Sequence, residues 1–310
     1  MTLNILFSAL SERWEEYETH LRRAFDATVL AVDLRTEFPP EEVDYIIYAP
    51  NSGLSDFSPF TRLKGVHNLW AGVETVVGNP TLQVPFARMV DYGLTQGMVE
   101  WVTGHVLRHH LGMDRHVLGQ DGIWREGAPP LARDRRVVIF GIGALGRACA
   151  EMLTKLHFQV FGWSSSPKNI PGVTCFDGAE GFEQALQQAE IAVTLLPDTP
   201  DTTGLFNAAA FARMPKGAVI INPGRGPLIA NDDLIAALDA GQLAHATLDA
   251  FKVEPLPPEH PFWAHPKVTV TPHIASATRA STASEVIAAN FARSERGEQM
   301  LHLVDFNRGY

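Results

Sequence analysis

An arginine held between two glycines stands directly after a short aliphatic run, in the segment "VIINPGRGPLI". Residues 219–221 predict a strand of a parallel sheet that is apolar on both faces, and Asn222 and Pro223 end it. A guanidinium on a tight turn loses rotamer freedom and solvation, so we expect Arg225 to have a partner. The partner is either a structural carboxylate or a bound anion, because the guanidinium fork matches a carboxylate at two points.

Two more chemically competent side chains follow the next two strand-like runs. Glu254 lies in "LDAFKVEPLP", and His273 ends "VTVTPHIA". The carboxyl ends of parallel strands share one edge of a sheet, which is where ligands of such folds bind, so we expect both side chains near Arg225. A histidine with a carboxylate partner can donate a proton. His273 alone would more often be a structural histidine, but the set of three favours catalysis.

Strand-like and helix-like segments alternate along the whole chain, which is typical of an α/β protein. The first third contains four strand-like runs ("NILFSAL", "ATVLAV", "DYIIYAP" and "VHNLWAG") and a helix over residues 12–24. A long helix over 94–110 connects this part to six further strand-like runs between residues 135 and 274, and a last helix covers 283–296. We predict a Rossmann-type doubly wound parallel sheet in residues 98–278. A smaller flavodoxin-like α/β substrate domain is expected in residues 1–97 and 279–310.

The segment "VVIFGIGALGRACAEML" has the G-x-G-x-x-G spacing of a dinucleotide-binding turn, at Gly141, Gly143 and Gly146. The motif follows an apolar strand and opens a helix, which is the context that gives it meaning. The turn would place the free N–H groups of the helix start, including those of Ala144 and Leu145, against a pyrophosphate. A plain strand–turn–helix is the less favoured alternative.

The end of the next strand predicts the type of cofactor. An NAD-binding turn carries Asp or Glu about 20 residues after the first glycine, to bind the ribose 2′-hydroxyl. Here the text is "FGWSSSPKNIPG", with no acid before Asp177. Hydroxyl groups and one ammonium suit a 2′-phosphate instead, so we expect NADPH to be preferred, with NADH possible. The expected contacts of this segment are Trp163, Ser164, Ser165, Ser166 and Lys168.

Taken together, "GIGALG", "LLPDTPDTTGLFN", "INPGRG", "LDAFKVEPLP" and "TPHIA" resemble the D-isomer-specific 2-hydroxyacid dehydrogenase family in order and spacing, across nearly the whole chain. Within that family, "WSSSPKNIPGV" and the ending "FNRGY" resemble most the glyoxylate/hydroxypyruvate reductase A group. The resemblance implies that Arg225 holds the substrate carboxylate and polarises the carbonyl, that His273 supplies the proton, and that Glu254 supports His273.

The resemblance also implies further ligand contacts. Those to the cofactor are Leu196, Pro197, Asn222, Pro223, Gly224, Asp249, Ala275 and Met98. In the loop "WAGVE", usually Gly-Ala-Gly-Val-Asp, the backbone of Ala71, Gly72 and Val73 would bind the substrate, and Trp70 and Glu74 depart from the family pattern. Tyr48 would line the pocket. Duller alternatives stay open: a core aromatic for Tyr48, a helix-core methionine for Met98 and a capping residue for Asp249.

Composition narrows the partners of this 310-residue chain. Its net charge of −10 argues against nucleic acid and anionic membranes, but local arginines can still bind small anions. No apolar run approaches the ~20 residues that span a bilayer, and "LNILFSAL" reads as a first strand and not as a signal peptide. Two cysteines offer neither a disulfide framework nor metal spacing, so a reducing cytoplasm is expected. His105 and His109 are expected on a helix surface or a subunit interface, without metal.

The leading hypothesis is therefore NADPH-dependent reduction of a small 2-keto acid, glyoxylate or hydroxypyruvate, to the 2-hydroxy acid. One alternative is an NAD-linked dehydrogenase for a bulkier D-2-hydroxy acid. The other is a non-catalytic protein that senses dinucleotides, since this fold also serves that purpose. The family implies a homodimer.

Overall fold

The computed structural model describes residues 2–306 and 309, and it divides the chain into two compact units. Unit 1 consists of Met1–Leu94 and Ala277–Tyr310, and unit 2 of Thr95–Ser276. Three of the last four residues, Asn307, Arg308 and Tyr310 in the ending "FNRGY", lie outside the described residues. Each unit is built on its own parallel sheet, as the α/β prediction requires.

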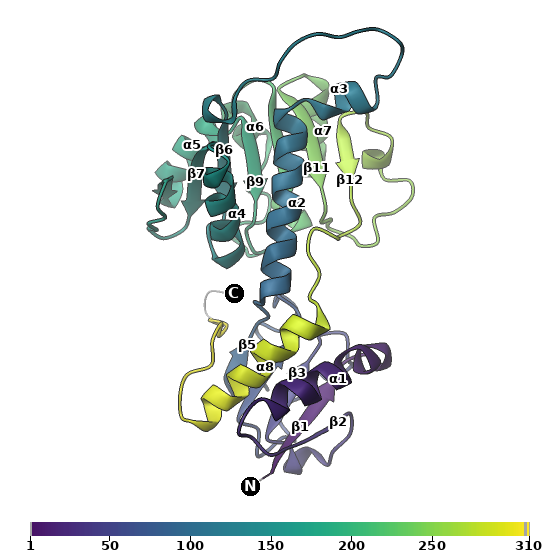
Figure 1. Ribbon diagram of the computed structural model, residues 1–310, viewed down its shortest axis with the longest axis vertical. Coiled ribbons are helices and arrows are strands. Elements are labelled where there is room, and N and C mark those ends of the chain that lie inside the picture. The colour runs from purple at the N-terminus through teal and green to yellow at the C-terminus, as the bar shows by residue number, and fades with distance from the viewer. Residues whose placement is uncertain (1, 307–308, 310) are drawn as a thin grey trace. The chain divides into compact units, whose positions relative to one another are not determined.

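Unit 1 contains a five-stranded sheet with the strand order β2-β1-β3-β4-β5, which is that of a flavodoxin-like domain, although the sequence indicated only four strands and the two-residue β5 was missed. Its strands are β1 (Leu3–Ser8), β2 (Val32–Arg35), β3 (Tyr45–Tyr48), β4 (Gly65–Asn68) and β5 (Phe86–Ala87). Two helices, α1 (Ser11–Asp26) and α8 (Ala280–Glu295), pack against each other on this sheet (Figure 1). They bury Leu21, Phe25 and Phe291 in a common core, which brings the last helix back to the first strands.

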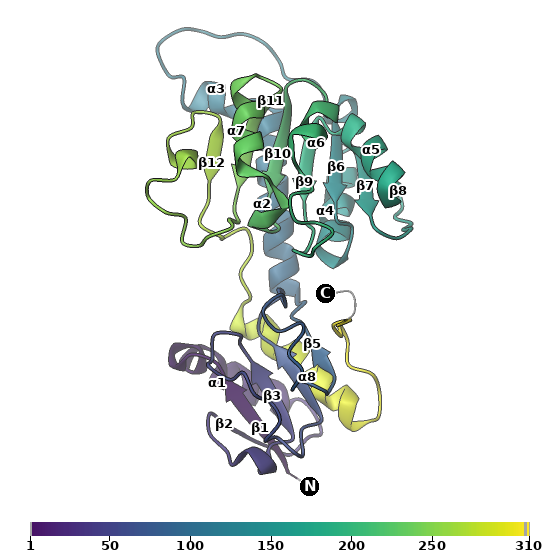
Figure 2. The same ribbon diagram turned by 180° about the vertical axis from the view of Figure 1, so that it is seen from behind.

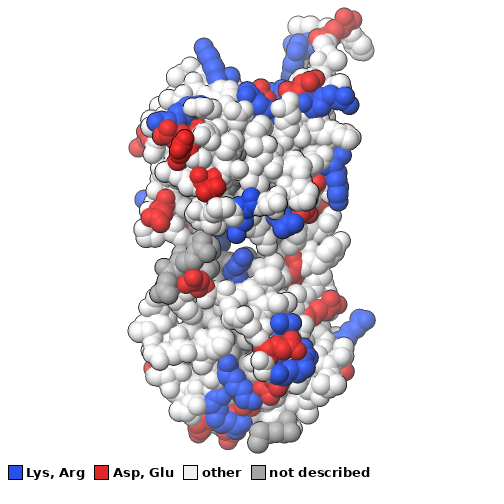
Figure 3. Space-filling model, turned by 90° about the vertical axis from the view of Figure 1, so that its left-hand side faces the viewer, with Lys and Arg blue, Asp and Glu red and all other residues white. Residues whose placement is uncertain are grey.

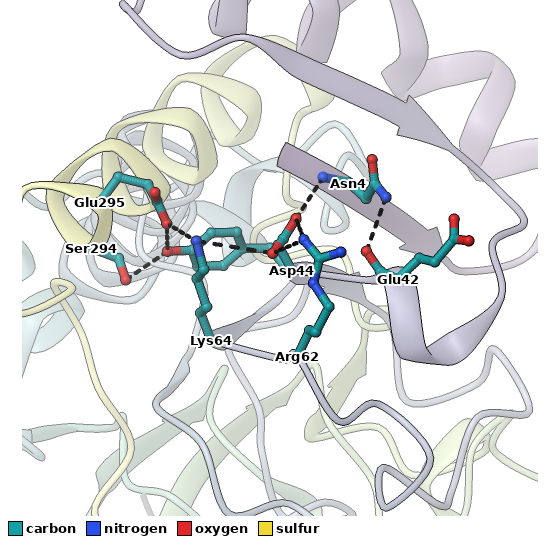
Figure 4. A network of polar contacts seen from close by, with 8 residues as sticks. Asn4, Glu42, Asp44, Arg62, Lys64, Ser294 and Glu295 are labelled. Atoms are coloured by element: carbon teal, nitrogen blue, oxygen red, sulfur yellow. Dashed lines mark hydrogen bonds and ion pairs between the residues drawn. The ribbon is translucent and has the colours of Figure 1, made fainter. Parts of the chain in front are cut away.

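A polar network fixes α8 to the sheet of unit 1 (Figure 4). The hydroxyl of Tyr45 donates to Glu295 Oε1 at 2.7 Å, and Lys64 Nζ lies 2.8 Å from the same oxygen. The buried carboxylate of Asp44 accepts from Arg62 at 3.0 Å. A buried charge is tolerated when it is paired and hydrogen-bonded, so this network supplements the apolar contact between the helix and the sheet.

Unit 2 contains a seven-stranded sheet with the order β12-β11-β10-β9-β6-β7-β8. Its strands are β6 (Arg136–Phe140), β7 (Gln159–Ser164), β8 (Val173–Asp177), β9 (Ile191–Thr194), β10 (Ala218–Asn222), β11 (Leu243–Leu248) and β12 (Val268–Val270). Counted from β6, this is the doubly wound Rossmann order with one more strand at the far edge. The expectation of six strands was wrong, because β8 was missed. It is an edge strand without a continuous apolar run, so it lacks the pattern of the central strands.

Helices cover both faces of this sheet. The first face carries α2 (Tyr92–His110) and α4 (Ala144–Lys155), and the second carries α5 (Gly178–Gln188), α6 (Ala208–Arg213) and α7 (Asn231–Asp239) (Figure 2). A short helix, α3 (Met113–Val117), follows α2. Central strands such as β9 and β10 are buried along their whole length. Each fully buried aliphatic side chain there contributes roughly 1.5–3 kcal/mol, which gives the carboxyl edge of the sheet a rigid support.

The surface of the molecule carries charges of both signs. On the face shown in Figure 3, Lys and Arg side chains lie among Asp and Glu side chains in each unit. Within residues 2–306 and 309, no helix combines the length and the apolar character needed to cross a membrane.

Candidate active site

The glycine-rich turn links β6 to α4 at the point where the strand order of unit 2 reverses, between β6 and β9. Gly141 has φ +100°, and a Cβ on it would lie 2.4 Å from the carbonyl oxygen of Leu195, which follows β9. A Cβ on Gly146 would lie 1.9 Å from the carbonyl oxygen of Gly141. These two glycines therefore let the turn, the helix and the neighbouring strand approach closely.

Gly143 differs from its two neighbours, because a Cβ on it would meet no atom within 4 Å. It occupies the N-cap position of α4 and is exposed, and no side chain caps this helix start. The open backbone at the N-terminus of a 12-residue helix fits the pyrophosphate of a dinucleotide, which needs free N–H groups and close approach. Exposed Ala144 and half-buried Leu145 form the first turn.

The segment expected to select the cofactor follows β7. Ser164 is half-buried and its hydroxyl donates to the carbonyl of Ser166 at 2.7 Å, whereas Ser165 and Lys168 are exposed. The register of β7 and β8 pairs Ser164 with Asp177, so a carboxylate that is distant in the sequence stands one strand away. Sequence reasoning missed this neighbour, because β8 itself was missed.

Arg225 lies on the turn after β10, half-buried, with extended backbone. Its Nη1 donates to the carbonyl of Gly224 at 2.9 Å. A Cβ on the following glycine, Gly226, would lie 2.0 Å from the carbonyl carbon of Phe251. The arginine turn therefore packs directly against the backbone that leads to Glu254.

His273 and Glu254 are in contact. His273 Nδ1 lies 2.7 Å from Glu254 Oε2, and the other carboxylate oxygen accepts from the backbone N–H of Phe251 at 2.8 Å. The side chain of His273 is 47% exposed, so its ring reaches solvent while Nδ1 is engaged. The carboxylate thereby directs Nε2 outward, as a proton donor requires. His273 also has φ +54°, which is uncommon for a residue with a side chain.

Several other expected cofactor contacts lie at the same edge of unit 2. Leu196 and the carbonyl of Pro197, which accepts from Thr202, follow β9. Asn222, Pro223 and Gly224 form the buried start of the arginine turn. Asp249 follows β11 and is fully buried, and Ala275 lies two residues after His273 and is 4% exposed.

Two of the expected contacts are core side chains in this structure. Trp163 is 8% exposed, packs with Phe140 and Phe182, and uses its indole N–H on the carbonyl of Gly178 at 2.8 Å. Met98 lies on α2 and packs in the core on the buried side of that helix. These positions favour packing for both side chains.

The predicted substrate residues of unit 1 lie at the carboxyl ends of β3 and β4. Tyr48 is 5% exposed and its hydroxyl donates to the carbonyl of Leu54 at 3.1 Å, which favours a core role. The loop of Ala71, Gly72 and Val73 follows β4, and the buried Asn68 donates to the carbonyl of Gly72 at 2.9 Å. Asn68 was missed, although the polar pair His67 and Asn68 at the end of a strand is a signal that could have identified it.

One of the two expectations for the histidines of α2, a place on the helix surface, is wrong for His109, whereas a subunit interface stays a prediction. His109 does not lie on the helix surface: its ring contacts Thr247 at 2.8 Å and stands 5.0 Å from the ring of His245, against the sheet of its own unit. Burial lowers the pKa of His109 to about 3, and the nearby His245 and Arg108 act in the same direction. Within residues 2–306 and 309, no group of three or more His, Cys, Asp or Glu side chains is arranged to hold a metal ion.

Comparison with known proteins shows similarity to one family. The family model "D-isomer specific 2-hydroxyacid dehydrogenase, NAD binding domain" matches residues 102–275. A glyoxylate/hydroxypyruvate reductase A of Serratia proteamaculans is 42% identical over 257 residues, which are 80% of this chain and 82% of that protein.

Solved structures of two other proteins are similar to this chain over its full length. A D-isomer-specific 2-hydroxyacid dehydrogenase of Xanthobacter autotrophicus Py2, in complex with NADPH and MES, superposes with a TM-score of 0.93 at 39% identity, over 100% of both chains. An NADPH-dependent glyoxylate/hydroxypyruvate reductase of Sinorhizobium meliloti, in complex with NADP and sulfate, gives a TM-score of 0.84 at 36% identity, over 100% of this chain and 99% of the other.

Proposed function

The chain belongs to the D-isomer-specific 2-hydroxyacid dehydrogenase family, and on that basis we propose that it reduces glyoxylate, hydroxypyruvate or a 2-keto acid of similar size with NADPH. The observation that carries this proposal is the contact between His273 and Glu254, beside the Arg225 turn and on the same sheet edge as the glycine-rich turn. A proton donor, an anion-binding group and a dinucleotide turn are the parts that reduction of a keto acid needs.

Each side chain has a distinct role in the proposed reaction. Bound NADPH would supply a hydride to the keto carbon. The guanidinium of Arg225 holds the substrate carboxylate and stabilises the negative charge that develops on the keto oxygen. His273, protonated, gives the proton on Nε2 to that oxygen, while Glu254 holds Nδ1 and stabilises the imidazolium.

The cofactor preference follows from the segment after β7 and from the relatives that hold NADPH or NADP. Ser164, Ser165, Ser166 and Lys168 offer donors to a 2′-phosphate. Because Asp177 stands beside Ser164 in the sheet register, a carboxylate opposes part of that attraction. We expect NADPH to be favoured over NADH by at least about tenfold in kcat/KM, which is equivalent to ~1.4 kcal/mol.

We propose that the backbone of Ala71, Gly72 and Val73 binds the substrate carboxylate. Tyr48 is buried in the core, and this position does not favour a contact between its side chain and the substrate. A cytoplasmic location is part of the same proposal.

We also propose a homodimer. The segment after α3 exposes large apolar side chains, among them Leu118, Ile123 and Trp124, the last of which is 88% exposed. Clustered exposure of this kind often marks a protein contact. Light scattering after size exclusion should give twice the mass of one chain, and a monomer at micromolar concentration would contradict this part.

A panel of 2-keto acids, each with NADPH and with NADH, tests the proposed function. Glyoxylate and hydroxypyruvate should give the highest kcat/KM with NADPH. Faster turnover of a bulky 2-keto acid with NADH would favour the NAD-linked alternative. Tight NADPH binding without turnover of any 2-keto acid would favour a dinucleotide sensor.

A further inference from the structure

Two buried polar side chains end neighbouring central strands of unit 2, directly beneath the turns that carry Arg225 and His273. Asn222 is the last residue of β10 and is 1% exposed, and Asp249 follows β11 and is 0% exposed. A buried polar group is costly unless it is hydrogen-bonded, so the partners of these two side chains indicate what they do.

Asp249 uses both carboxylate oxygens on the segment around His273. Oδ1 accepts from the hydroxyl of Thr271 at 2.6 Å and from the N–H of Ile274 at 2.9 Å, and Oδ2 accepts from the N–H of Ala275 at 2.8 Å. The three donors lie on either side of His273. One carboxylate thus grips the chain before and after the histidine.

These hydrogen bonds to Asp249 are important because His273 has an uncommon backbone conformation. Its φ of +54° lies in the left-handed region, which a side chain disfavours and which persists only where the surroundings impose it. The bonds from Ile274 and Ala275 to Asp249 hold the peptides that follow this residue. They thereby fix the direction in which the imidazole leaves the chain.

Asn222 holds the arginine turn in the same way. Its Oδ1 accepts from the N–H of Gly224 at 3.1 Å and from the hydroxyl of Thr194 at 2.6 Å, and its Nδ2 donates to the carbonyl of Arg225 at 2.9 Å. The two supports are joined, because the N–H of Asp249 donates to the carbonyl of Asn222 at 3.0 Å. A chain of hydrogen bonds through these two buried residues therefore connects both turns.

We propose that Asn222 and Asp249 form a buried brace that positions Arg225 and His273 relative to each other. The inference rests on the proposed function for the roles of Arg225 and His273, and it makes Asn222 and Asp249 positioning residues, while their contacts to the cofactor stay a prediction. Asp249 acts through His273, and Asn222 acts through Arg225.

Asp249→Asn tests the first part of the proposal, that Asp249 positions His273. The amide keeps the size of the side chain but replaces one acceptor by an NH₂ group that faces a backbone N–H or the Thr271 hydroxyl. We expect kcat for the 2-keto acid to fall on the order of 100-fold, as small misplacements of catalytic groups do. The Kd of NADPH, measured by fluorescence titration, should change less than about threefold.

A double-mutant cycle separates positioning from a direct cofactor contact or general destabilisation. In a His273→Gln background, Asp249→Asn should lower the single-turnover rate by less than about threefold, because the group it positions is gone. The brace is overturned if the full loss persists in that background, or if the loss resides in the Kd of NADPH.

Thr247→Val provides a matched control. Thr247 is also fully buried on β11, but its hydroxyl bonds to His109 and not to the His273 segment. This variant should leave kcat unchanged even if its melting temperature falls. A comparable fall in kcat would mean that loss of any buried side-chain hydrogen bond on β11 impairs the site, which contradicts the proposal.

A readout without activity keeps the brace distinguishable from the proposed function. Hydrogen exchange of the Ile274 and Ala275 amides should accelerate at least about tenfold in Asp249→Asn and stay unchanged in Thr247→Val. Unchanged exchange in Asp249→Asn overturns the brace. Absence of 2-keto acid reduction by the unmodified protein would instead refute only the proposed function.

Two further variants test the second part of the proposal, that Asn222 positions Arg225, and replace Asp249→Asn if that variant does not fold. Asn222→Asp keeps an acceptor for Gly224 but loses the donor to Arg225, so KM for the 2-keto acid should rise while the Kd of NADPH stays constant. The opposite pattern contradicts the second part. If Asp249→Asn does not fold, Thr271→Val removes one of the three bonds and should give a smaller fall in kcat, and no fall would contradict the first part.

Discussion

Alanine at Gly143 and alanine at Gly146 are expected to fail in different ways, although only three positions separate the two residues. At Gly143, the new Cβ meets no atom within 4 Å and φ is −73°, so the methyl group fits the folded chain. Glycine is a better N-cap than alanine, and we expect a loss of about 1 kcal/mol in the free energy of unfolding.

The cost of Gly143→Ala should appear in cofactor binding. A methyl group on the exposed backbone keeps a pyrophosphate from the N–H groups at the start of α4. Loss of one charge-assisted hydrogen bond weakens the binding free energy of NADPH by roughly 1.5–3 kcal/mol. The Kd of NADPH should therefore rise about 10- to 100-fold.

Gly146→Ala should instead damage the fold. Its Cβ would lie 1.9 Å from the carbonyl oxygen of Gly141 and 3.2 Å from Ile139 Cγ2, so the backbone of the turn must move. Overpacking typically costs about 1–3 kcal/mol and occasionally more, and here the clash is with backbone that cannot rotate away. Denaturant titration and calorimetric NADPH titration of both variants measure the two effects. Normal NADPH affinity in Gly143→Ala, or a normal denaturation midpoint in Gly146→Ala, would refute the assignment of this turn.

Three further outcomes are expected. Arg225→Ala should lower kcat/KM for glyoxylate by roughly 100- to 1000-fold with little change in the Kd of NADPH. Arg225→Lys should restore little of this loss, because a point charge cannot replace the guanidinium fork. Near-normal kinetics of Arg225→Ala would exclude the anion-binding role. Lys168→Ala should weaken NADPH but not NADH, and Ser164→Asp should reverse the preference, whereas equal use of both cofactors by the unmodified protein would remove the basis for both effects. Burial lowers the pKa of His67 from 6.5 to about 4 and that of His109 to about 3, so the unfolded chain binds more protons below pH ~6.5. The free energy of unfolding should therefore fall as pH falls through this window, by on the order of 3 kcal/mol for His67 alone, and urea midpoints that stay constant between pH 7 and pH 4 would contradict the burial of these rings.

The parts of the fold that the sequence predicts correctly are those with a strong local pattern. The strand before Gly141 and the helix after it follow from an apolar run and a glycine spacing, and the sequence places Arg225 after a strand in the same way. The contact between His273 and Glu254 was expected because strands that follow one another in a doubly wound sheet end at one edge.

What the sequence alone does not predict depends on register and burial. The edge strand β8 alternates only weakly, so neither the strand nor the position of Asp177 beside Ser164 could be inferred from local pattern. His109 looks like a surface residue until the sheet that it faces is known. The brace made by Asn222 and Asp249 likewise requires knowledge of which backbone groups their side chains reach.

The most direct test of the central claim is the reduction of hydroxypyruvate with NADPH, followed by the loss of reduced-nicotinamide absorbance and by chiral analysis of the product. A dehydrogenase specific for the D-isomer should consume one NADPH for each glycerate formed and release only the D-enantiomer. His273→Gln should abolish most of this turnover and still bind NADPH. An L-product, or NADPH consumption that does not depend on the keto acid, would contradict the account.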